Sequence, residues 1–542
     1  MILYAPMQSY ARGPRATIVR KSIGECFLET ARRFPERLAI VSRQQSIRLS
    51  WAEYAHEAQR FAAGLRALGI RPGDRVGLWA TNCAEWAIIQ FGCALAGAIL
   101  VNVNPANRSH ELSFVLRKSR MRVLFLHSQD RRANYRAILE ESRSGKASAL
   151  EHVVYLDSPA WKEFLREPDG VETRPDPGEP ANIQYTSGTT GEPKGVLLTH
   201  INLVNNGRFF AEYLRLSEQD RICVPVPLFH CFGSVIGTMA AAVTGAACIF
   251  PAATFDPLAT LEAVDAERAT AIYGVPAMFI AELQHPEFSR FKLKTLRTGV
   301  MAGAPCPIEI MKRVVNEMHC PQMLVAYGQT ESSPGITSSR VDDDVETRCT
   351  TVGCPLPETE VRIASPSGET LPVGEHGELL ARGYMVMKGY DGDPEASARA
   401  IDADGWLHTG DVAMMRPDGY FKITGRAKDM IIRGGENVYP REIEEFLHTH
   451  PAVAEAQVIG IPDERLGEAV VAWIRLKAGH APDENEIRAF CCERLAYYKV
   501  PQHVRFVESY PMTLSGKVQK FKMRELEVAS RGLEAAGARE TA

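Results

Sequence analysis

Residues 185–195 read Tyr-Thr-Ser-Gly-Thr-Thr-Gly-Glu-Pro-Lys-Gly, and this stretch decides how the rest of the chain is interpreted. It holds three glycines, four Ser or Thr hydroxyls, one proline and one lysine, between apolar Ile183 and Val196. Glycines let the backbone turn and come close to a ligand, and successive N–H groups in such a turn suit anions. Lys194 adds a positive charge on a flexible stem. The stretch therefore predicts a phosphate-binding loop.

The loop has two alternative interpretations. A Walker A loop places Ser or Thr directly after its lysine, whereas Gly195 follows Lys194 here. A flexible Gly/Ser/Thr connector is the second alternative. A connector has no need of a proline and a lysine at fixed places between two apolar runs, so the phosphate-binding interpretation is preferred.

The loop resembles the signature of the adenylate-forming superfamily, which contains acyl-CoA synthetases, firefly-type luciferases and peptide-synthetase adenylation domains. Every fixed position of that signature is matched, and further family motifs follow in the same order as far as residue 517. The resemblance therefore covers nearly the whole chain. It implies that ATP is bound by Thr186, Ser187, Gly188, Thr189, Thr190, Gly191 and Lys194.

Composition restricts the class of protein. The chain has 542 residues, 45% hydrophobic and 24% charged, which is typical of a globular protein with more than one folding unit. A net charge of −4 gives no electrostatic basis for nucleic-acid binding. The twelve cysteines lack CxxC or CxxH spacing, which favours reduced thiols and a cytoplasmic location over a disulfide framework or a zinc site.

We expect no membrane-spanning segment. The longest weakly polar run, residues 236–253, contains Gly, Thr and Pro and is interpreted as buried core. The first 24 residues carry four basic and no acidic side chains, so an organellar transit peptide is an alternative. Pro14 and the lack of an amphipathic pattern argue against it. The oligomeric state is left open, with a homodimer as one alternative.

Strands alternate with helices before the loop. Ser50-Trp51-Ala52-Glu53 is a capping box that opens a helix ending at Gly69, and 82–85 should cap a second helix that runs to Gly97. Strands are expected at 76–80, 98–103 and 123–127, a helix at 109–119, and a surface connection at 158–181. After the loop, Thr199 should cap another helix. This alternation predicts an α/β fold whose parallel sheet is covered on both faces.

The segment 225–230 places one histidine beside a phenylalanine. A lone histidine in such a place is usually a packed, hydrogen-bonded side chain. The family has an aromatic residue or a histidine here, at the border of its acyl pocket. The resemblance therefore implies that the pocket is lined by His230, Phe232, Gly233 and Ser234.

The segment 327–331 reads Tyr-Gly-Gln-Thr-Glu. An aromatic ring can stack on a purine, a threonine can donate to phosphate oxygens, and a glutamate can bind Mg²⁺. The resemblance implies these three roles for Tyr327, Thr330 and Glu331, with Gly328 in the same motif. It also implies that Gly303, Ala304 and Pro305 lie beside the adenine, although a simple turn explains those three equally well. The acidic run 342–344 is interpreted as a solvated loop.

The segment 406–411 matches the next family motif and ends in Asp411. A carboxylate can accept hydrogen bonds from both ribose hydroxyls, and the resemblance gives this role to Asp411, with Arg426 also on the nucleotide. The alternative for Asp411 is a turn carboxylate after Gly410.

Composition changes near Gly425, and the residues after it have their own apolar periodicity. Helices are expected at 440–449 and 483–495, and strands at 454–459, 470–476 and 504–507, with Cys491 in the core. We therefore predict a large N-terminal domain of layered α/β subdomains (1–425), a hinge (426–430) and a small α+β domain (431–542). The tail after about residue 528 is expected to fray.

The resemblance gives the small domain its chemistry. It implies that Lys428 is the hinge position, that Gly434 and Gly435 line a tunnel for the pantetheine arm of coenzyme A, and that Lys517 is the catalytic lysine. A lysine in a loop such as 514–517 is otherwise simply exposed. An ammonium at the α-phosphate stabilises the negative charge that grows there during attack.

The resemblance as a whole implies an ATP- and Mg²⁺-dependent ligase that turns a carboxylic acid into its coenzyme A thioester through an acyl-adenylate. The runs 228–235 and 331–334 look most like the medium-chain fatty acyl-CoA synthetase branch, and a cyclic or aryl acid is the alternative.

Other functions stay open. The chain could load an acid onto a carrier-protein pantetheine, although no carrier domain is expected because the chain ends soon after Lys517. A luciferase-like oxygenase is less favoured. A non-catalytic nucleotide-binding homologue is disfavoured because both Lys194 and Lys517 are present.

Overall fold

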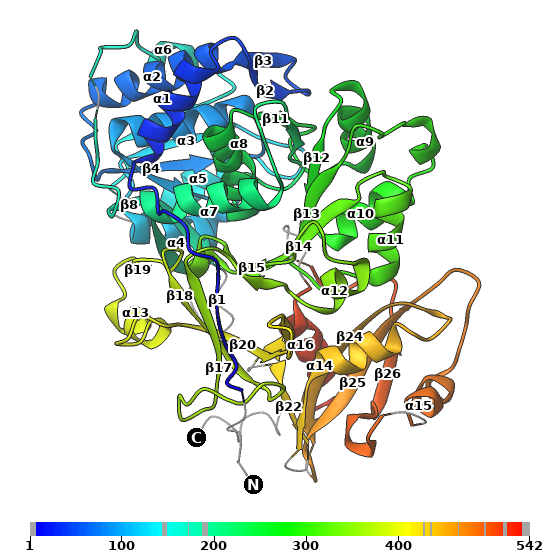
Figure 1. Ribbon diagram of the computed structural model, residues 1–542. Helices are drawn as coiled ribbons and strands as arrows, with labels where there is room; N and C mark the ends of the chain where they lie inside the picture. The colour runs from blue at the N-terminus through cyan, green and yellow to red at the C-terminus, as the bar shows by residue number, and fades with distance from the viewer. Residues whose placement is uncertain are drawn as a thin grey trace. The chain divides into compact units, whose positions relative to one another are not determined.

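The computed structural model describes residues 7–143, 149–171, 173–186, 193–426, 429–433, 436–463, 465–492, 495–512 and 518–533. The chain divides into two compact units. The larger unit holds Ala11–Val361 and Ala381–His408, and the smaller holds Met1–Tyr10, Arg362–Leu380 and Thr409–Ala542. Helices and strands are mixed in both (Figure 1), which confirms the predicted α/β class.

One sheet of the larger unit carries the predicted loop. Its seven strands have the order β19-β9-β8-β5-β4-β6-β7. The five strands from β8 to β7 run parallel, and β9 and β19 are added antiparallel at one edge. The bounds are β4 Arg75–Trp79, β5 Ile99–Asn102, β6 Val123–Leu126, β7 His152–Tyr155, β8 Pro180–Thr186, β9 Lys194–Thr199 and β19 Gly389–Tyr390.

A nine-stranded sheet carries the other motifs of this unit. Its order is β16-β15-β14-β13-β12-β10-β11-β2-β3, with a parallel centre from β14 to β2 and antiparallel ends. The bounds are β2 Leu38–Ser42, β3 Ile47–Ser50, β10 Arg221–Cys223, β11 Ala247–Phe250, β12 Ala271–Gly274, β13 Thr298–Ala302, β14 Gln322–Gly328, β15 Gly335–Ser338 and β16 Cys354–Pro355. A five-stranded sheet, whose strands belong partly or wholly to the smaller unit, has the order β1-β17-β18-β20-β21, with β1 Tyr10–Arg12, β17 Thr359–Ala364, β18 Gly377–Gly383, β20 Leu407–Met415 and β21 Phe421–Arg426.

Helices of the larger unit pack around these sheets. The green helices α9, α10 and α11 lie beside β12, β13 and β14 in Figure 1, and the blue α1, α2 and α3 contact one another. The helix bounds are α1 Ile23–Arg33, α2 Trp51–Ala67, α3 Ala84–Ala96, α4 Ser109–Ser119, α5 Tyr135–Arg143, α6 Pro159–Phe164, α7 His200–Tyr213, α8 Ala240–Thr244, α9 Pro257–Ala266, α10 Pro276–Leu283, α11 Ile308–Asn316, α12 Val345–Thr350 and α13 Pro394–Ala400. A π-helix, η1, spans Phe232–Met239, and short 3₁₀ turns are η2 Phe288–Arg290 and η3 Thr330–Ser332.

An aromatic cluster holds α1, α2 and α3 together. Phe27, Trp51, Tyr54 and Phe91 are fully buried, and the rings of Phe27 and Phe91 stack with centroids 4.4 Å apart. Truncating one of these rings to alanine costs roughly 3–5 kcal/mol in a packed core. This cluster fixes α1 and α2 against α3, the helix that contacts β4 and β5 of the seven-stranded sheet.

Local end signals were predicted well. Ser50 and Glu53 form a reciprocal capping box at the start of α2, and Thr199 does the same with Asn202 at α7. Gly97 ends α3 with φ +71°, a left-handed conformation that glycine adopts without strain. The acidic run behaves as expected for a loop, because Asp344 caps α12 by accepting the N–H of Thr347 at 2.7 Å.

Two predicted segments differ from the structure. Asn82 does not cap α3, since its side chain bonds residues 226 and 228, and the N–H of Ala84 donates instead to Gln45 Oε1 at 2.8 Å. The expected surface connection 158–181 contains α6, whose Trp161 and Phe164 are buried in the main core. Both errors have one cause: the decisive partners are distant in sequence.

The run 236–253 is buried core, as predicted, and comprises the second half of η1, all of α8 and the strand β11. Across the described residues, no helix has both the length and the apolar character that a bilayer crossing requires.

The smaller unit has a sheet with the order β23-β22-β25-β24, and β26 pairs with β25. Its elements are β22 Ile431–Arg433, β23 Glu436–Val438, α14 Pro440–Leu447, β24 Val453–Asp463, β25 Gly467–Leu476, α15 Glu484–Cys492, η5 Tyr497–Lys499, β26 His503–Phe506 and α16 Lys520–Arg531. The predicted helices and strands are confirmed, Asp483 accepts the N–H of Glu486 at the start of α15, and Cys491 is fully buried.

The C-terminal helix α16 was not predicted and extends past the expected fraying point at residue 528. It is anchored by Glu527, which is 1% exposed and accepts from Trp473 Nε1 at 2.8 Å, Arg531 at 2.7 Å and Arg505 at 3.1 Å. Burial alone would raise the pKa of this carboxyl, but the hydrogen bonds from the two guanidiniums and the indole lower it. A buried charge that is fully paired in this way ties α16 to β25 and β26.

Candidate active site

Strands β8 and β9 bring the two ends of the predicted phosphate-binding loop together. They pair antiparallel, with Thr186 opposite Lys194 and Tyr185 opposite Gly195. The Thr186 hydroxyl donates to the Lys194 carbonyl oxygen at 3.5 Å. The loop is therefore a hairpin connection, and Lys194 is the first residue of β9. The predicted loop residues Ser187, Gly188, Thr189, Thr190 and Gly191 lie outside the described residues.

The adenine-side candidates lie at the carboxyl edge of β13 and β14. These strands are parallel, with Ala302 opposite Ala326, so the exposed segment after β13 lies next to Tyr327 at the end of β14. That segment comprises Gly303, Ala304 and Pro305. Ligands of α/β sheets bind at this edge of the strands.

Gly328 is required by the backbone, not only by a ligand. A Cβ at this position would lie 1.8 Å from the carbonyl oxygen of Pro334. The strand bulges here, where β14 pairs with β15. The bulge redirects the chain into η3, which carries Thr330 and Glu331.

The η3 turn is locked by hydroxyl groups. Ser332 accepts the N–H of Gln329 at 3.0 Å and donates to the carbonyl of Pro334 at 2.6 Å. Ser333 donates to the carbonyl of Met385 at 2.7 Å. Both serines are fully buried. Their hydrogen bonds fix the backbone that carries Glu331, and this backbone sets the orientation of its side chain.

A residue that sequence reasoning missed, Tyr390, joins two of the predicted site residues. Its hydroxyl donates to Glu331 Oε1 at 2.9 Å, and Lys194 Nζ lies 4.9 Å from the centroid of its ring. Burial raises the pKa of Tyr390, and the Glu331 carboxylate raises it further, so the phenol stays protonated. No local signal marked this tyrosine, because its partners come from β9 and η3.

The donors present fit a Mg²⁺ ion that is shared with nucleotide phosphates. Glu331 Oε2 has no hydrogen-bond partner in the described part of the chain, and the neighbouring Thr330 offers a hydroxyl oxygen. Within that same part, no group of three or more His, Cys, Asp and Glu side chains is placed to hold a metal. Mg²⁺ commonly takes one or two carboxylates together with substrate phosphates and water, so one glutamate suffices.

The His230 segment is held by two buried amides. Asn82 Nδ2 donates to the Val226 carbonyl at 2.9 Å while its Oδ1 accepts the N–H of Leu228 at 2.8 Å, and Asn102 Nδ2 donates to the Phe229 carbonyl at 2.8 Å. His230 Nδ1 accepts the N–H of Phe232 at 3.2 Å. Since Nδ1 is the acceptor, the neutral ring carries its proton on Nε2.

The other acyl-pocket candidates start η1. Ser234 donates to the His230 carbonyl at 3.2 Å, and the ring of Phe232 stacks on Tyr273 with centroids 6.0 Å apart. A Cβ on Gly233 would lie 2.4 Å from the Pro227 carbonyl oxygen, so glycine is required for packing there. Ser234 also borders a hollow of about 20 Å³ with Trp86, Gln90, Asn102 and Asn182, which has room for no more than a water molecule.

A chain of buried amides connects the His230 segment to the hairpin. Gln184 donates to Asn182 Oδ1 at 2.8 Å, Asn182 donates to Asn102 Oδ1 at 2.9 Å, and Asn102 donates to the Phe229 carbonyl. Gln184 and Asn182 belong to β8, two and four residues before Thr186. The acyl-side segment and the phosphate-side strand thus share one hydrogen-bond network. Amides inside otherwise apolar strand ends are the signal that would have found it.

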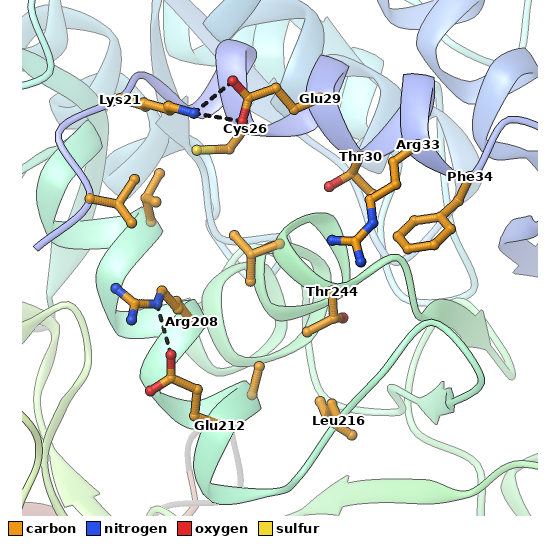
Figure 2. Close-up of a pocket in the computed structure, with 14 residues that line it drawn as sticks. Lys21, Cys26, Glu29, Thr30, Arg33, Phe34, Arg208, Glu212, Leu216 and Thr244 are labelled. Carbon is orange, nitrogen blue, oxygen red and sulfur yellow. Dashed lines mark hydrogen bonds and ion pairs between the residues drawn. The ribbon is translucent and has the colours of Figure 1, made fainter. Parts of the chain in front are cut away.

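A hollow of about 400 Å³ lies elsewhere in the larger unit, between α1, α7 and α8 (Figure 2). Lys21 pairs with Glu29 and Arg208 pairs with Glu212 on its rim, so four of its charges are neutralised within the chain. None of the predicted site residues lines it. It is separate from the candidate active site.

The smaller unit carries the ribose-side candidates. Asp411 of β20 stands opposite Arg426 of β21, and Arg426 Nε lies 3.2 Å from Asp411 Oδ1. Asp411 is 7% exposed and sits in a strand, which overturns the alternative of a turn carboxylate. The remaining candidates Lys428, Gly434, Gly435 and Lys517 lie outside the described residues.

Comparison with known proteins agrees with this geometry. Residues 27–391 match the family model described as AMP-binding enzyme, and residues 442–517 match the AMP-binding enzyme C-terminal domain. The chain belongs to the AMP-binding enzyme family. Within that family it is an AMP-forming acid–CoA ligase, which makes an acyl-CoA from a carboxylic acid by way of an acyl-adenylate.

Relatives of this AMP-binding enzyme carry matching names. It is 44% identical to a putative acyl-CoA synthetase, YngI, of Bacillus subtilis (strain 168), with 94% of this chain and 98% of the relative covered. It is 41% identical to the mitochondrial medium-chain acyl-CoA ligase ACSF2 of Danio rerio, with coverages of 97% and 91%. The crystal structure of the anthranilate CoA ligase AuaEII with anthranoyl-AMP is similar, with 29% identity, a TM-score of 0.85 and coverages of 94% and 98%.

Proposed function

We propose that the preferred substrate is a medium-chain fatty acid or an acid of similar size, and that the protein works in the cytoplasm. Relatives at about 40% identity are named medium-chain acyl-CoA ligases, which supports a fatty acid of medium chain length. The similarity to an anthranilate CoA ligase keeps an aryl acid as the second candidate. The observation that carries the nucleotide chemistry, on which this proposal rests, is the Lys194–Tyr390–Glu331 group beside the β8–β9 hairpin. In this assignment the group supplies a cation for the phosphates of a nucleotide and a carboxylate for their metal ion.

In the first step, a carboxylate oxygen of the acid attacks the α-phosphorus of ATP. The new oxygen–phosphorus bond forms as the bond to the bridging oxygen breaks, and pyrophosphate leaves with the electron pair. In our assignment Lys194 and the backbone N–H groups of the loop hold the phosphates, Thr330 donates to them, and Glu331 binds Mg²⁺. Bound Mg²⁺ would neutralise phosphate charge. Lys517 stabilises the charge that develops at the α-phosphate.

In the second step, the thiol sulfur of coenzyme A attacks the acyl carbon. A carbon–sulfur bond forms, the bond to the AMP oxygen breaks, and the thiol proton passes to solvent. We assign Asp411 and Arg426 to the ribose and nucleotide, Lys428 to the hinge, and Gly434 and Gly435 to the pantetheine tunnel.

An acid panel tests the proposed substrate. Linear acids from four to sixteen carbons and a set of aryl acids are assayed for pyrophosphate release with ATP and Mg²⁺, with and without coenzyme A. We expect the highest kcat/KM near eight to twelve carbons and a thioester product. A preference for aryl acids would move the assignment to the second candidate. Thioester formed only on a carrier protein, or no acid-dependent release at all, would refute the proposal.

Two substitutions separate the half-reactions. We expect Lys517→Ala to lower acyl-AMP formation by about 10²- to 10³-fold and to spare thioester formation from supplied acyl-AMP. Gly435→Trp should do the reverse. Equal losses in both half-reactions would mean that these residues act on folding only.

A further inference from the structure

Tyr390 stands between the cation and the carboxylate of the candidate site. Its ring faces Lys194 Nζ, with 4.9 Å to the centroid, and its hydroxyl bonds Glu331 at 2.9 Å. Lys194 and Glu331 themselves form no ion pair in the described part of the chain. Opposite charges left beside each other would pair directly, and that pair would compete with phosphate and metal. The tyrosine gives each of them a neutral partner instead.

Several contacts between distant segments hold the Tyr390 ring in place. β19 pairs antiparallel with β9, with Tyr390 opposite Val196, and the N–H of Tyr390 donates to Ser397 Oγ at 2.8 Å. The next residue, Asp391, donates its N–H to the Gly195 carbonyl at 2.7 Å and forms a bidentate pair with Arg75 at 2.6 and 3.0 Å.

The other side of the segment is fixed to the Glu331 turn. The N–H of Met387 donates to the Glu331 carbonyl at 2.9 Å. Tyr390 is therefore tied through the backbone both to the strand that begins with Lys194 and to the turn that carries Glu331. A shift of either would move the ring, so the segment sets the spacing of the two charged groups.

We propose that Tyr390 is a positioning residue of the adenylation step: its hydroxyl orients Glu331 for the metal ion, and its ring keeps Lys194 apart from that carboxylate and directed at the phosphates. The proposal rests on the proposed function of Lys194 and Glu331. The hydroxyl occupies one lone pair of Oε1 and leaves Oε2 to the metal. Outer partners of metal ligands are commonly worth 10- to 100-fold in metal affinity.

The matched test compares Tyr390→Phe with Tyr135→Phe. Tyr135 also donates to a carboxylate, Asp130 Oδ2 at 2.8 Å, but it begins the helix that follows β6, which β4 and β5 separate from β8 in the sheet. Mn²⁺ binding is followed by electron paramagnetic resonance with α,β-methylene ATP, which the enzyme cannot cleave. We expect Tyr390→Phe to weaken Mn²⁺ binding by about 10- to 100-fold and Tyr135→Phe to leave it unchanged. Equal Mn²⁺ affinities for the two variants would overturn the proposal.

Tyr390→Leu tests the ring. It should show the metal defect of Tyr390→Phe and, in addition, a rise of about 2- to 30-fold in the KM for ATP, because the cation–π contact is lost. Both variants should form thioester from supplied acyl-AMP at the wild-type rate. Equal losses in the two half-reactions would mean a structural role and would also overturn the proposal.

Failure of the proposed function is distinguishable from failure of this inference. If wild-type protein released no pyrophosphate with any acid, the acid-activating assignment would fall. The Mn²⁺ measurement does not require turnover, so its outcome would still decide whether Tyr390 positions a metal ligand.

Discussion

Two tyrosine–carboxylate pairs of the larger unit have nearly the same geometry and different surroundings. Tyr135 donates to Asp130 at 2.8 Å, and Tyr390 donates to Glu331 at 2.9 Å. The other oxygen of Asp130 accepts the N–H groups of Arg132 and Ala133 at 2.7 and 2.8 Å. Asp130 is saturated by its own loop, whereas Glu331 keeps one oxygen without a partner among the described residues.

The two pairs also differ in how far their partners are apart in sequence. Asp130 and Tyr135 are five residues apart, and the Tyr135 ring stacks on Trp79 with centroids 4.4 Å apart. Glu331 and Tyr390 are 59 residues apart and are brought together by the β9–β19 pairing and by the hydrogen bond from the Met387 N–H to the Glu331 carbonyl. A carboxylate such as that of Asp130, whose two oxygens accept hydrogen bonds from residues nearby in sequence, stabilises its own loop. An unsaturated one, positioned by distant segments and lying beside a cation, is suited to a ligand.

The largest expected effect separates the two carboxylates. Glu331→Gln should lower kcat/KM for ATP by roughly 10²- to 10³-fold with little change in stability, because the removed charge serves a bound ligand. Asp130→Asn should lower the free energy of unfolding by about 1–2 kcal/mol and leave turnover intact. Pyrophosphate release and urea denaturation measure the two quantities. If both variants lost stability and neither had a lower rate of pyrophosphate release than that loss explains, Glu331 and Asp130 would have the same structural role.

The two cations that lie over tyrosine rings provide the second comparison. Lys194 Nζ is 4.9 Å from the Tyr390 centroid, and the Arg136 guanidinium is 4.4 Å from that of Tyr155. We expect Lys194→Met to lower kcat/KM for ATP by about 10²-fold, and Lys194→Arg to recover only part, because a guanidinium has a different shape. Arg136→Met should keep the wild-type KM. An equal rise in the KM for ATP in Lys194→Met and Arg136→Met would show that the effect comes from losing a cation–ring contact and not from a role of Lys194 in binding ATP.

A third carboxyl, Glu282 of α10, is buried without any such partner. It is 1% exposed, its Oε2 has no hydrogen-bond partner in the described part, and burial raises its pKa well above the ordinary 4.5. Above pH 4.5 the unfolded chain releases a proton that the native chain keeps, so stability falls as pH rises, by up to about 1.4 kcal/mol per pH unit.

Glu282→Gln should remove this pH dependence. Its gain in urea midpoint over wild type should be larger at pH 8 than at pH 5, and exposed Glu163→Gln serves as the control for the loss of one charge. Parallel stability curves for Glu282→Gln and wild type between pH 5 and 8 would contradict the assignment of a neutral buried carboxyl.

The smallest effect concerns a phenol with no acceptor. Tyr273 is fully buried, and its hydroxyl has no hydrogen-bond partner among the described residues. Tyr273→Phe keeps the ring that stacks on Phe232 and removes an unsatisfied polar group, so stability should rise by less than about 1 kcal/mol. A loss of stability of more than about 1 kcal/mol, measured by thermal unfolding, would mean that the Tyr273 hydroxyl does make a hydrogen bond.

Much of the fold could be predicted from the sequence because its signals are short-range. The capping box of Ser50 and Glu53 and the left-handed Gly97 act within one helical turn, and both were located correctly. Lys194 was singled out by its glycine-rich loop, and Tyr327 and Glu331 by their place in the series of family motifs. The roles assigned to them remain proposals.

The residues that the sequence did not reveal act across long separations. Asn82 reads as a helix cap, yet it holds a segment 144 residues away, and the two aromatic rings of α6 read as part of a connection although they belong to the core. Tyr390 follows a glycine in a polar stretch and carries no pattern of its own. Its function in the site depends on strand pairing that no local periodicity encodes.

By itself, the sequence determined the helix ends that local capping signals set, a glycine-rich loop with Lys194 near its end, and membership of an acid-activating family. These depend on backbone conformation and residue chemistry within a few positions. The tertiary structure alone decided which oxygen of Glu331 is occupied, which ring Lys194 faces, and which amides hold the His230 segment. Such facts are set by the pairing of strands that are remote in the chain, since side chains meet there only after the sheet has formed.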